Sequence, residues 1–295
     1  MRKSDYWSFG GHFFFLFVVT LILFGSVGCS PDPTPTSVNT LRSPPTEKPA
    51  SHTTTPLKLT LASPTLTIAA ATPIPTIEAL DIPLGIGIYN ADNVEVFNKY
   101  AREQDVIAAR PPFMYLLDEV ERGQKKLVFA PRDEPLTDIQ SIISEAKSLG
   151  VTIIGYNLEM AVPRDDLIRR EAEMQVVASR NDVLYVFGPT LLKLEKFYDD
   201  FARHADVILL QSQHYQTTEE YEERVEDLIE KIRFTNPEVQ VWVQVSVNPP
   251  TNRQITPEEV ISDIQLITDR ADLIWIYYVP KTASVMEEVF KRLRR

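Results

Sequence analysis

The chain has 295 residues, and its 41 Asp and Glu against 30 Lys and Arg give a formal net charge of −11 at pH 7. This acidic balance argues against nucleic acid and anionic lipid surfaces as partners, because both carry the same sign of charge. Cys29 is the only cysteine, which excludes an intrachain disulfide and leaves the fold to depend on its hydrophobic core.

Residues 1–29 are organised like a secretory signal. A short positive region precedes the apolar stretch 13–24, which is too short to span a bilayer comfortably, and small residues then lead to Cys29. The stretch resembles a bacterial lipoprotein signal, although Ser26 stands where that family usually has Leu. The resemblance implies cleavage before Cys29 and a lipid on that residue. The alternative is an uncleaved anchor helix over 7–27, and both interpretations place the remaining chain outside the cytoplasm.

Residues 30–80 are dominated by Pro, Thr and Ser, with few charges and no sustained helical or strand period. Such a segment cannot bury enough apolar surface to offset the entropy of ordering it. We expect a disordered, semi-extended linker that holds the following domain away from the membrane and that could carry O-glycans.

Residues 81–295 alternate short apolar runs with amphipathic segments, which is typical of βα units. The length is sufficient for one sizeable core. The expected strands are 84–89, 105–109, 126–130, 151–156, 183–187, 206–210, 240–247 and 272–278. The expected helices are 92–103, 113–122, 136–149, 164–179, 191–204, 218–234, a helix beginning at the Thr256-Pro257-Glu258-Glu259 start signal, and 283–293.

Eight βα units with short links predict an α/β fold, a single (β/α)₈ TIM barrel with a parallel sheet. An open doubly wound sheet is the alternative. It is disfavoured because no glycine-rich phosphate turn follows the first strand.

In such a barrel the site lies where the strands end, so the polar and aromatic residues at these ends are candidates. Residues two apart in a strand share a face, and three strands repeat this spacing with polar side chains. The strand-end residues are Tyr89, Asn90, Arg110, Arg132, Asp133, Glu134, Asn157, Glu159, Gln211, Gln213, His214, Tyr215, Gln244, Ser246, Asn248, Trp275, Tyr277 and Tyr278.

Amides beside aromatic rings are typical of a sugar site, because amides hydrogen-bond hydroxyls and rings pack on the apolar side of a pyranose. The alternative is a polar layer in which the side chains satisfy one another. We predict substrate-binding roles for Gln211, Gln213, Tyr215, Ser246, Asn248, Trp275 and Tyr277.

Other chemistries fit the sequence less well. A metal centre needs grouped ligands, and only His214 of the four histidines is near the predicted mouth. A Ser–His–acid triad fails likewise, because Ser246 has only His214 as a partner and lies in no nucleophile elbow. A two-carboxylate glycosidase would use Glu159 and needs a second carboxylate, for which Asp133 or Glu134 is a candidate.

Asn157-Leu158-Glu159 resembles the Asp-x-Glu end of the family 18 glycoside hydrolase motif DxxDxDxE. In that family the Glu is the general acid, and the preceding Asp supports attack by the substrate's acetamido group. Here Asn157 stands at the Asp position, as in the family 85 enzymes with the same assisted mechanism, and Gly155 stands where another Asp belongs. The resemblance covers one strand end.

A second resemblance covers most of the domain. Tyr156-Asn157-Leu158-Glu159, Gln211-Ser212-Gln213, Ser246-Val247-Asn248-Pro249 and the aromatic last strand are similar to an uncharacterised family of secreted bacterial TIM-barrel proteins. This resemblance implies the fold and a site at the strand ends, without naming a substrate.

We therefore expect an extracytoplasmic, membrane-anchored bacterial lipoprotein that hydrolyses a glycan, with catalytic roles for Glu159 and Asn157. Glu159 would be the general acid, and Asn157 would position an acetamido group or a water. The alternative is a non-catalytic barrel that binds carbohydrate or cell-wall glycan. The expected partners are a glycan and, through the lipid on Cys29, the membrane; no nucleic acid, cofactor or metal is expected.

Overall fold

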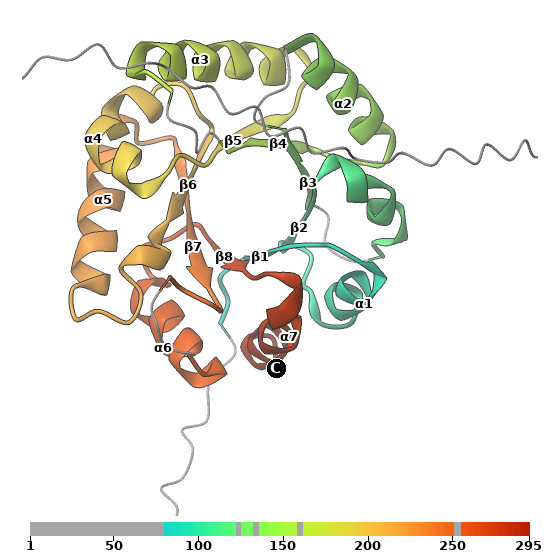
Figure 1. Ribbon diagram of the computed structural model, residues 1–295, viewed down its shortest axis with the longest axis vertical. Helices are drawn as coiled ribbons and strands as arrows, with labels where there is room; N and C mark the ends of the chain where they lie inside the picture. Colours follow the sequence, from blue (N-terminus) through green and yellow to red (C-terminus); the bar gives the residue numbers. More distant parts are fainter. Residues whose placement is uncertain (1–79, 122–124, 132–135, 158–161, 251–254) are drawn as a thin grey trace, which may run out of the picture. The chain divides into compact units, whose positions relative to one another are not determined.

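The barrel is formed by eight parallel strands that pair in sequence order and close between β1 and β8. The computed structural model describes residues 80–121, 125–131, 136–157, 162–250 and 255–295. Figure 1 looks along the barrel and shows the strands as an inner ring with helices around it. The predicted (β/α)₈ fold is confirmed.

The elements follow one another in βα order, with ends that differ from the predicted ones by a few residues at most sites. The strands are β1 Leu84–Gly87, β2 Val106–Ala109, β3 Lys125–Ala130, β4 Ile153–Tyr156, β5 Leu184–Phe187, β6 Val207–Gln211, β7 Gln240–Ser246 and β8 Leu273–Tyr277. The α-helices are α1 Ala91–Tyr100, α2 Leu136–Ser148, α3 Arg164–Arg180, α4 Leu191–Phe201, α5 Tyr221–Thr235, α6 Pro257–Ile267 and α7 Ala283–Leu293, and the 3₁₀ helices are η1 Pro111–Glu119, η2 Ser212–His214 and η3 Pro280–Thr282.

The short helix predicted over 113–122 has 3₁₀ geometry and begins two residues earlier, as η1. Its first turn closes over three residues, with the Phe113 N–H donating to the Arg110 carbonyl over 2.8 Å. Near its end the Lys126 ammonium donates to the Leu117 carbonyl over 2.7 Å. This bond holds η1 against β3.

Successive strand side chains point alternately into the barrel and towards the helices. The outward set packs with the helices in one large core that includes Ile107, Val128, Ile154, Ile208 and Ile274. The inward set forms a second, smaller core inside the ring, consisting of Val106, Ala108, Leu127, Ile153, Val186, Val207, Leu209, Trp242, Leu273 and Trp275. The interior of the ring is therefore filled by side chains.

Three aromatic rings fill the middle of this interior. Trp242 and Trp275 are stacked, with ring centroids 6.4 Å apart and an interplanar angle of 3°. Phe129 meets Trp275 edge to face at 5.7 Å. Gly85 makes room for this arrangement, because a Cβ at that position would lie 2.7 Å from Trp275 Cζ3. A larger residue on β1 would displace the indole.

A buried ion pair closes the opposite, amino-terminal end of the barrel. Arg294 and Asp105 are 1% and 0% exposed, and their side chains are directly paired. The same guanidinium donates to the carbonyls of Leu80 and Ile82 over 3.0 and 2.9 Å. The Leu84 N–H donates to the Asp105 carboxylate over 2.8 Å. The last turn of the chain is thus fastened to the segment that enters β1.

Several predictions concern residues outside the described part of the chain: the signal segment, Cys29 and almost all of the linker, together with Arg132, Asp133, Glu134 and Glu159. Within the described ranges, no helix has both the length and the apolar character needed to cross a membrane.

Candidate functional site

The carboxyl ends of the strands surround a cavity of about 460 Å³. This is the end of a (β/α)₈ barrel at which active sites lie. Its floor is made by Phe129 and Trp275, the upper rings of the interior core. The polar and aromatic residues of its walls are Tyr89, Arg110, Asn157, Thr190, Gln211, Gln213, His214, Gln244, Tyr277 and Tyr278.

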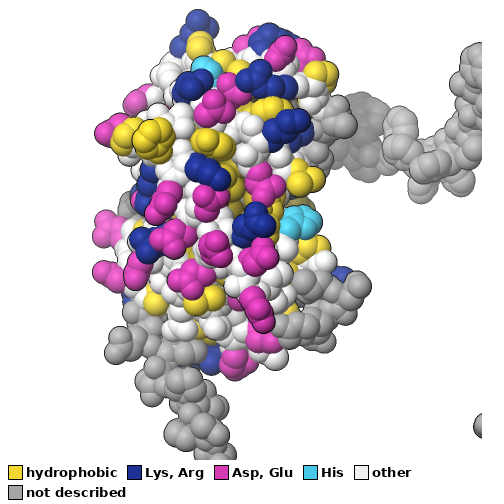
Figure 2. Space-filling model, turned by 90° about the vertical axis from the view of Figure 1, so that its left-hand side faces the viewer, with side chains coloured by type: hydrophobic (Ala, Val, Ile, Leu, Met, Phe, Trp, Pro, Cys, Tyr) yellow, Lys and Arg dark blue, Asp and Glu magenta, His cyan; other side chains and the backbone are white. Residues whose placement is uncertain are grey.

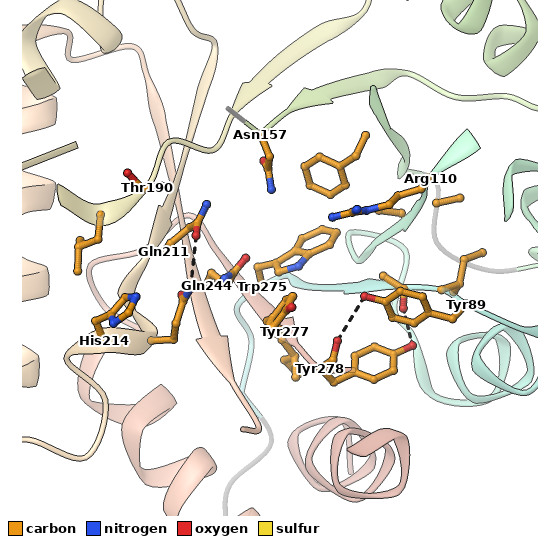
Figure 3. Close-up of a pocket in the computed structure, with 18 residues that line it drawn as sticks. Tyr89, Arg110, Asn157, Thr190, Gln211, His214, Gln244, Trp275, Tyr277 and Tyr278 are labelled. Atoms are coloured by element: carbon orange, nitrogen blue, oxygen red, sulfur yellow. Dashed lines mark hydrogen bonds between the residues drawn. The ribbon is translucent and has the colours of Figure 1, made fainter. Parts of the chain in front are cut away.

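Three glutamines on one wall form a chain of hydrogen bonds, which we call the amide relay (Gln244, Gln213 and Gln211). Gln244 Nε2 donates to Gln213 Oε1 over 2.9 Å, and Gln213 Nε2 donates to Gln211 Oε1 over 3.3 Å. Gln211 Nε2 then donates to the Gly188 carbonyl over 3.2 Å. Gln211 and Gln244 face each other in the register of β6 and β7, and the view of the cavity shows their amide ends directed into it (Figure 3).

The relay fixes which groups remain for a ligand. Each internal hydrogen bond contributes a net 0.5–1.5 kcal/mol, roughly, and holds one amide in one orientation. An amide nitrogen has two hydrogens and an amide oxygen has two lone pairs. After the relay is formed, each glutamine keeps a second hydrogen, and Gln244 Oε1, at the end of the chain, accepts no relay bond. This wall therefore presents fixed donors and acceptors side by side.

Asn157 occupies the neighbouring wall, where β4 ends. Its side chain lies over the backbone of Gly188, so closely that a Cβ at position 188 would overlap Oδ1. Oδ1 is buried and has no hydrogen-bond partner among the described residues. The amide nitrogen is consequently the end of Asn157 that reaches the cavity (Figure 3).

The aromatic residues divide into a floor and a rim. Trp275 is 4% exposed, so its faces are covered by the interior core, whereas Tyr277 is 37% exposed at the rim. Tyr89 and Tyr278 meet edge to face at 5.4 Å. The Tyr89 hydroxyl donates to the Tyr278 carbonyl over 3.3 Å, and the Tyr278 hydroxyl donates to the Gly87 carbonyl over 2.6 Å.

Tyr89 and Tyr278 both keep their hydroxyl protons at physiological pH, because burial raises the pKa of each. Burial raises the pKa of Tyr278 well above its usual range. Burial also raises the pKa of Tyr89, and the neighbouring Tyr277 adds to this effect, while the positive charge of Arg110 opposes it. Their hydrogens are engaged with backbone carbonyls, so these two hydroxyls act as fixed parts of the wall.

Arg110 and His214 are the basic side chains in the described lining of the cavity, and no carboxylate belongs to that lining. Arg110 continues the inward-facing series of β2 and extends over the floor towards the centre of the cavity (Figure 3). Within the described ranges, no three His, Cys, Asp or Glu side chains come together as a metal site.

Three residues predicted for substrate binding lie outside this lining. The Tyr215 hydroxyl donates to the Glu195 carboxylate on α4. Ser246 is 1% exposed, and its hydroxyl accepts a hydrogen bond from the Asn248 backbone N–H over 3.0 Å. Asn248 is exposed beyond the end of β7. The other predicted residues, Gln211, Gln213, Trp275 and Tyr277, come together with Asn157 in the cavity.

Gln216 has a structural role that no sequence pattern predicts. Its amide spans the end of β7: Nε2 donates to the Ser246 carbonyl over 3.1 Å, and Oε1 accepts the Ser246 N–H over 2.6 Å. Nε2 also lies 3.2 Å from the Asp263 carboxylate. Gln216 is fully buried, and it holds the loop after β6 against β7, which places Gln213 beside Gln244.

The floor also differs from the family 18 pattern. Gly155 on β4 stands where that motif has an acidic residue, and the Phe129 ring occupies the space that a side chain at position 155 would need. A carboxylate is thus sterically excluded there. The general-acid role predicted for Glu159 concerns a residue outside the described ranges, as do Asp133 and Glu134.

No family model matches the chain, and no curated protein matches it in sequence. The resemblances to a lipoprotein signal, to family 18 and to the secreted barrel family therefore stay predictions. Solved structures align over the barrel. A protein of Parabacteroides distasonis is 10% identical, over 72% of this chain and 97% of its own, with a TM-score of 0.48.

Two enzymes align similarly. Deoxyribose phosphate aldolase from Aeropyrum pernix is 12% identical, over 71% of this chain and 89% of its own, with a TM-score of 0.46. A chain of tryptophan synthase from Pyrococcus furiosus is 12% identical, over 72% of this chain and 94% of its own, with a TM-score of 0.47. The TIM-barrel assignment itself rests on the closed ring of eight parallel strands.

Proposed function

We propose that the barrel binds a carbohydrate in the cavity at the carboxyl ends of its strands. The amide relay carries this proposal. A sugar hydroxyl both donates and accepts a hydrogen bond, and the relay offers oriented donors and acceptors along one wall. Its amides are already partly satisfied by one another, so burying them beneath a ligand costs less than burying free amides.

The remaining walls suit the same class of ligand. Tyr277 at the rim offers a partly exposed ring to an apolar sugar face. The cavity volume of about 460 Å³ is within the range of pockets that enclose a small ligand, which corresponds here to one or two sugar residues. The floor of buried rings would set the depth to which a sugar enters.

Binding of the full chain to a glycan array tests this proposal, with Gln244→Ala compared with Gln265→Ala. Gln265 is exposed on α6, away from the cavity. We expect wild type and Gln265→Ala to bind the same glycans and Gln244→Ala to lose affinity by about tenfold or more, the scale of one or two hydrogen bonds to a ligand. If Gln244→Ala binds as tightly as wild type, the relay does not contact the glycan.

Glycan hydrolysis is the second candidate function. It is favoured by Asn157, which lines the cavity at the end of β4 and matches the residue that assists the reaction in Asn-x-Glu glycosidases. Glu159 follows two positions later and would be the general acid. Glu159→Gln separates the two functions: an enzyme loses turnover of the bound glycan and keeps its affinity, whereas a binding protein has no turnover to lose.

We also propose that the protein is exported and held at a membrane by a lipid on Cys29. The support is in the sequence alone, in the signal-like segment before Cys29 and the Pro-, Thr- and Ser-rich segment after it. Such an anchor would keep the barrel outside the cytoplasm, where glycans are available.

A further inference from the structure

Arg110 is the one strongly basic group in the described lining of the cavity, and nothing in the described chain neutralises it. Its side chain extends into the cavity from the end of β2 (Figure 3). Its guanidinium makes no ion pair or hydrogen bond with a described residue. The described lining contributes no carboxylate either, and the guanidinium faces the open space of the cavity.

This isolation contrasts with the outer surface of the barrel. Acidic and basic side chains are interspersed over the face that carries α4 and α5 (Figure 2). On α5, Arg224 pairs with Glu220 at 3.1 Å and Lys231 pairs with Asp227 at 2.6 Å. In a chain with a net charge of −11, carboxylates are abundant, yet the described walls of the cavity contain none.

The surroundings of Arg110 are largely apolar. A smaller cleft of about 260 Å³ adjoins the cavity and shares Arg110, Phe129 and Asn157 with it. Its other walls are Pro111, Pro112, Ala130 and Pro131, whose side chains carry no polar atom. An apolar wall lowers the local dielectric constant and so strengthens any charge pair formed beside it.

Asn157 adds a donor on the same side of the cavity. Because its Oδ1 is buried against Gly188, its Nδ2 group faces the cavity. A guanidinium and an amide N–H directed into one space are complementary to oxyanions, which accept several charge-assisted hydrogen bonds at once. A neutral hydroxyl carries no charge to pair with Arg110 and accepts fewer of these hydrogen bonds.

We infer that the ligand of this cavity carries an oxyanion, a carboxylate or a sulfate, that binds Arg110 beside Asn157, while the amide relay holds the hydroxyls on the opposite wall. The ligand class is then an acidic sugar. This inference rests on the proposed function, since it specifies which carbohydrates the cavity takes.

The test uses matched pairs of probes with the full chain. Oligogalacturonate is compared with its neutral methyl ester, and a sulfated galactan oligosaccharide with its desulfated form, for wild type, Arg110→Gln and Arg180→Gln. Arg180 is exposed at the end of α3, before β5, at the opposite end of the barrel, and its replacement changes the net charge equally. Comparison of the two acidic probes shows whether a carboxylate or a sulfate is preferred.

We expect at least one acidic probe to bind more tightly than its neutral partner by roughly tenfold to a hundredfold, the scale of a charge-assisted hydrogen-bond pair. Arg110→Gln should abolish this preference, and Arg180→Gln should keep it. If neutral and acidic probes bind equally and Arg110→Gln changes neither affinity, the inference is wrong while the carbohydrate proposal stands.

If no glycan binds, the carbohydrate proposal is wrong, and the inference is then decided by simple anions. Thermal unfolding is measured with citrate, malonate, sulfate and inorganic phosphate for the same three proteins. An anion-dependent rise in Tm that Arg110→Gln removes and Arg180→Gln retains supports an oxyanion site. A Tm that rises equally in all three proteins, or in none, overturns it.

Discussion

The side chain of Asn157 lies on the α-carbon of Gly188, in the space where any other residue would have its Cβ. The same glycine accepts the last hydrogen bond of the amide relay through its carbonyl, from Gln211 over 3.2 Å. Gly188 therefore connects the two walls of the cavity, and the position of each wall depends on the other.

The first prediction concerns this contact. Gly188→Ala adds a methyl group that overlaps Asn157 Oδ1, so Asn157 must rotate away from the cavity wall. We expect a loss of about 1–3 kcal/mol in the free energy of unfolding, as for other overpacked sites, and weaker ligand binding. Urea denaturation of Gly188→Ala, Asn157→Ala and the double variant measures the coupling. If the overlap with Asn157 causes the loss, Gly188→Ala should lower the free energy of unfolding by less in the Asn157→Ala background than in wild type. Losses that simply add in the double variant would contradict this explanation.

The second prediction concerns the ion pair at the amino-terminal end of the barrel. Arg294→Met leaves the Asp105 carboxylate buried without its partner and removes the donors to Leu80 and Ile82. We expect a loss of about 3–5 kcal/mol in the free energy of unfolding, which is typical when one partner of a buried ion pair is removed. Urea denaturation measures it. The exposed neighbour Arg295 is the control, and Arg295→Met should change stability by about 0.5 kcal/mol or less.

The third prediction concerns Glu171, a fully buried residue on α3 whose carboxylate oxygens have no hydrogen-bond partner among the described residues. Burial raises its pKa well above the usual range, and the charge of Asp200 adds to the effect. The protonated form is therefore favoured in the folded state. The raised pKa of Glu171 adds to the stability of the fold in full at pH values below the pKa that Glu171 has in the unfolded chain. This added stability is lost as pH rises towards the higher pKa that Glu171 has in the fold.

Glu171→Gln keeps the shape and removes this titration. The variant should gain stability over wild type as pH rises from 4.5 to 8, as measured by urea denaturation at both pH values. Glu173→Gln on the same helix is the control, since Glu173 is solvent-accessible and paired with Arg169 at 3.1 Å, and its difference from wild type should vary little with pH. If the free energies of unfolding of Glu171→Gln and wild type differ by the same amount at both pH values, Glu171 is ionised in the folded protein.

The fourth prediction concerns the anchor. If Cys29 carries a lipid, Cys29→Ser leaves no thiol to modify, and the protein should move from the membrane fraction to the soluble extracytoplasmic fraction. Fractionation together with incorporation of a labelled fatty acid measures this, with Ser43→Ala in the predicted linker as the control. A Cys29→Ser protein that stays in the membrane fraction would favour the uncleaved anchor helix.

The fold could be predicted because it depends on local pattern. The eight apolar runs and the amphipathic segments between them specify βα units, and parallel strands of this number close into a ring. Because side chains alternate between the two faces of a strand, the sequence also identifies inward-facing residues such as Gln211 and Trp275. The ends of elements follow less directly from such patterns, since end residues gain or lose only one or two hydrogen bonds.

The details of the site depend on neighbours that are distant in sequence. Trp275 was expected to be a platform for sugar, but Gly85 on β1 lets its ring sink into the interior, beside Trp242. The alternation of side chains along β6 ends where η2 begins. It therefore could not predict that Tyr215, just after η2, turns towards Glu195.

The two stacked indoles have a spectroscopic consequence. The chain has three tryptophans, and removal of the signal segment would leave only Trp242 and Trp275, both inside the barrel. All tryptophan fluorescence of the mature protein would then come from one ring pair directly beneath the cavity. Exciton coupling between the indoles should give the near-ultraviolet circular dichroism a signal that reports barrel closure. A ligand at the floor of the cavity would lie beside Trp275 and change the same signal, so ligand binding could be followed without a label.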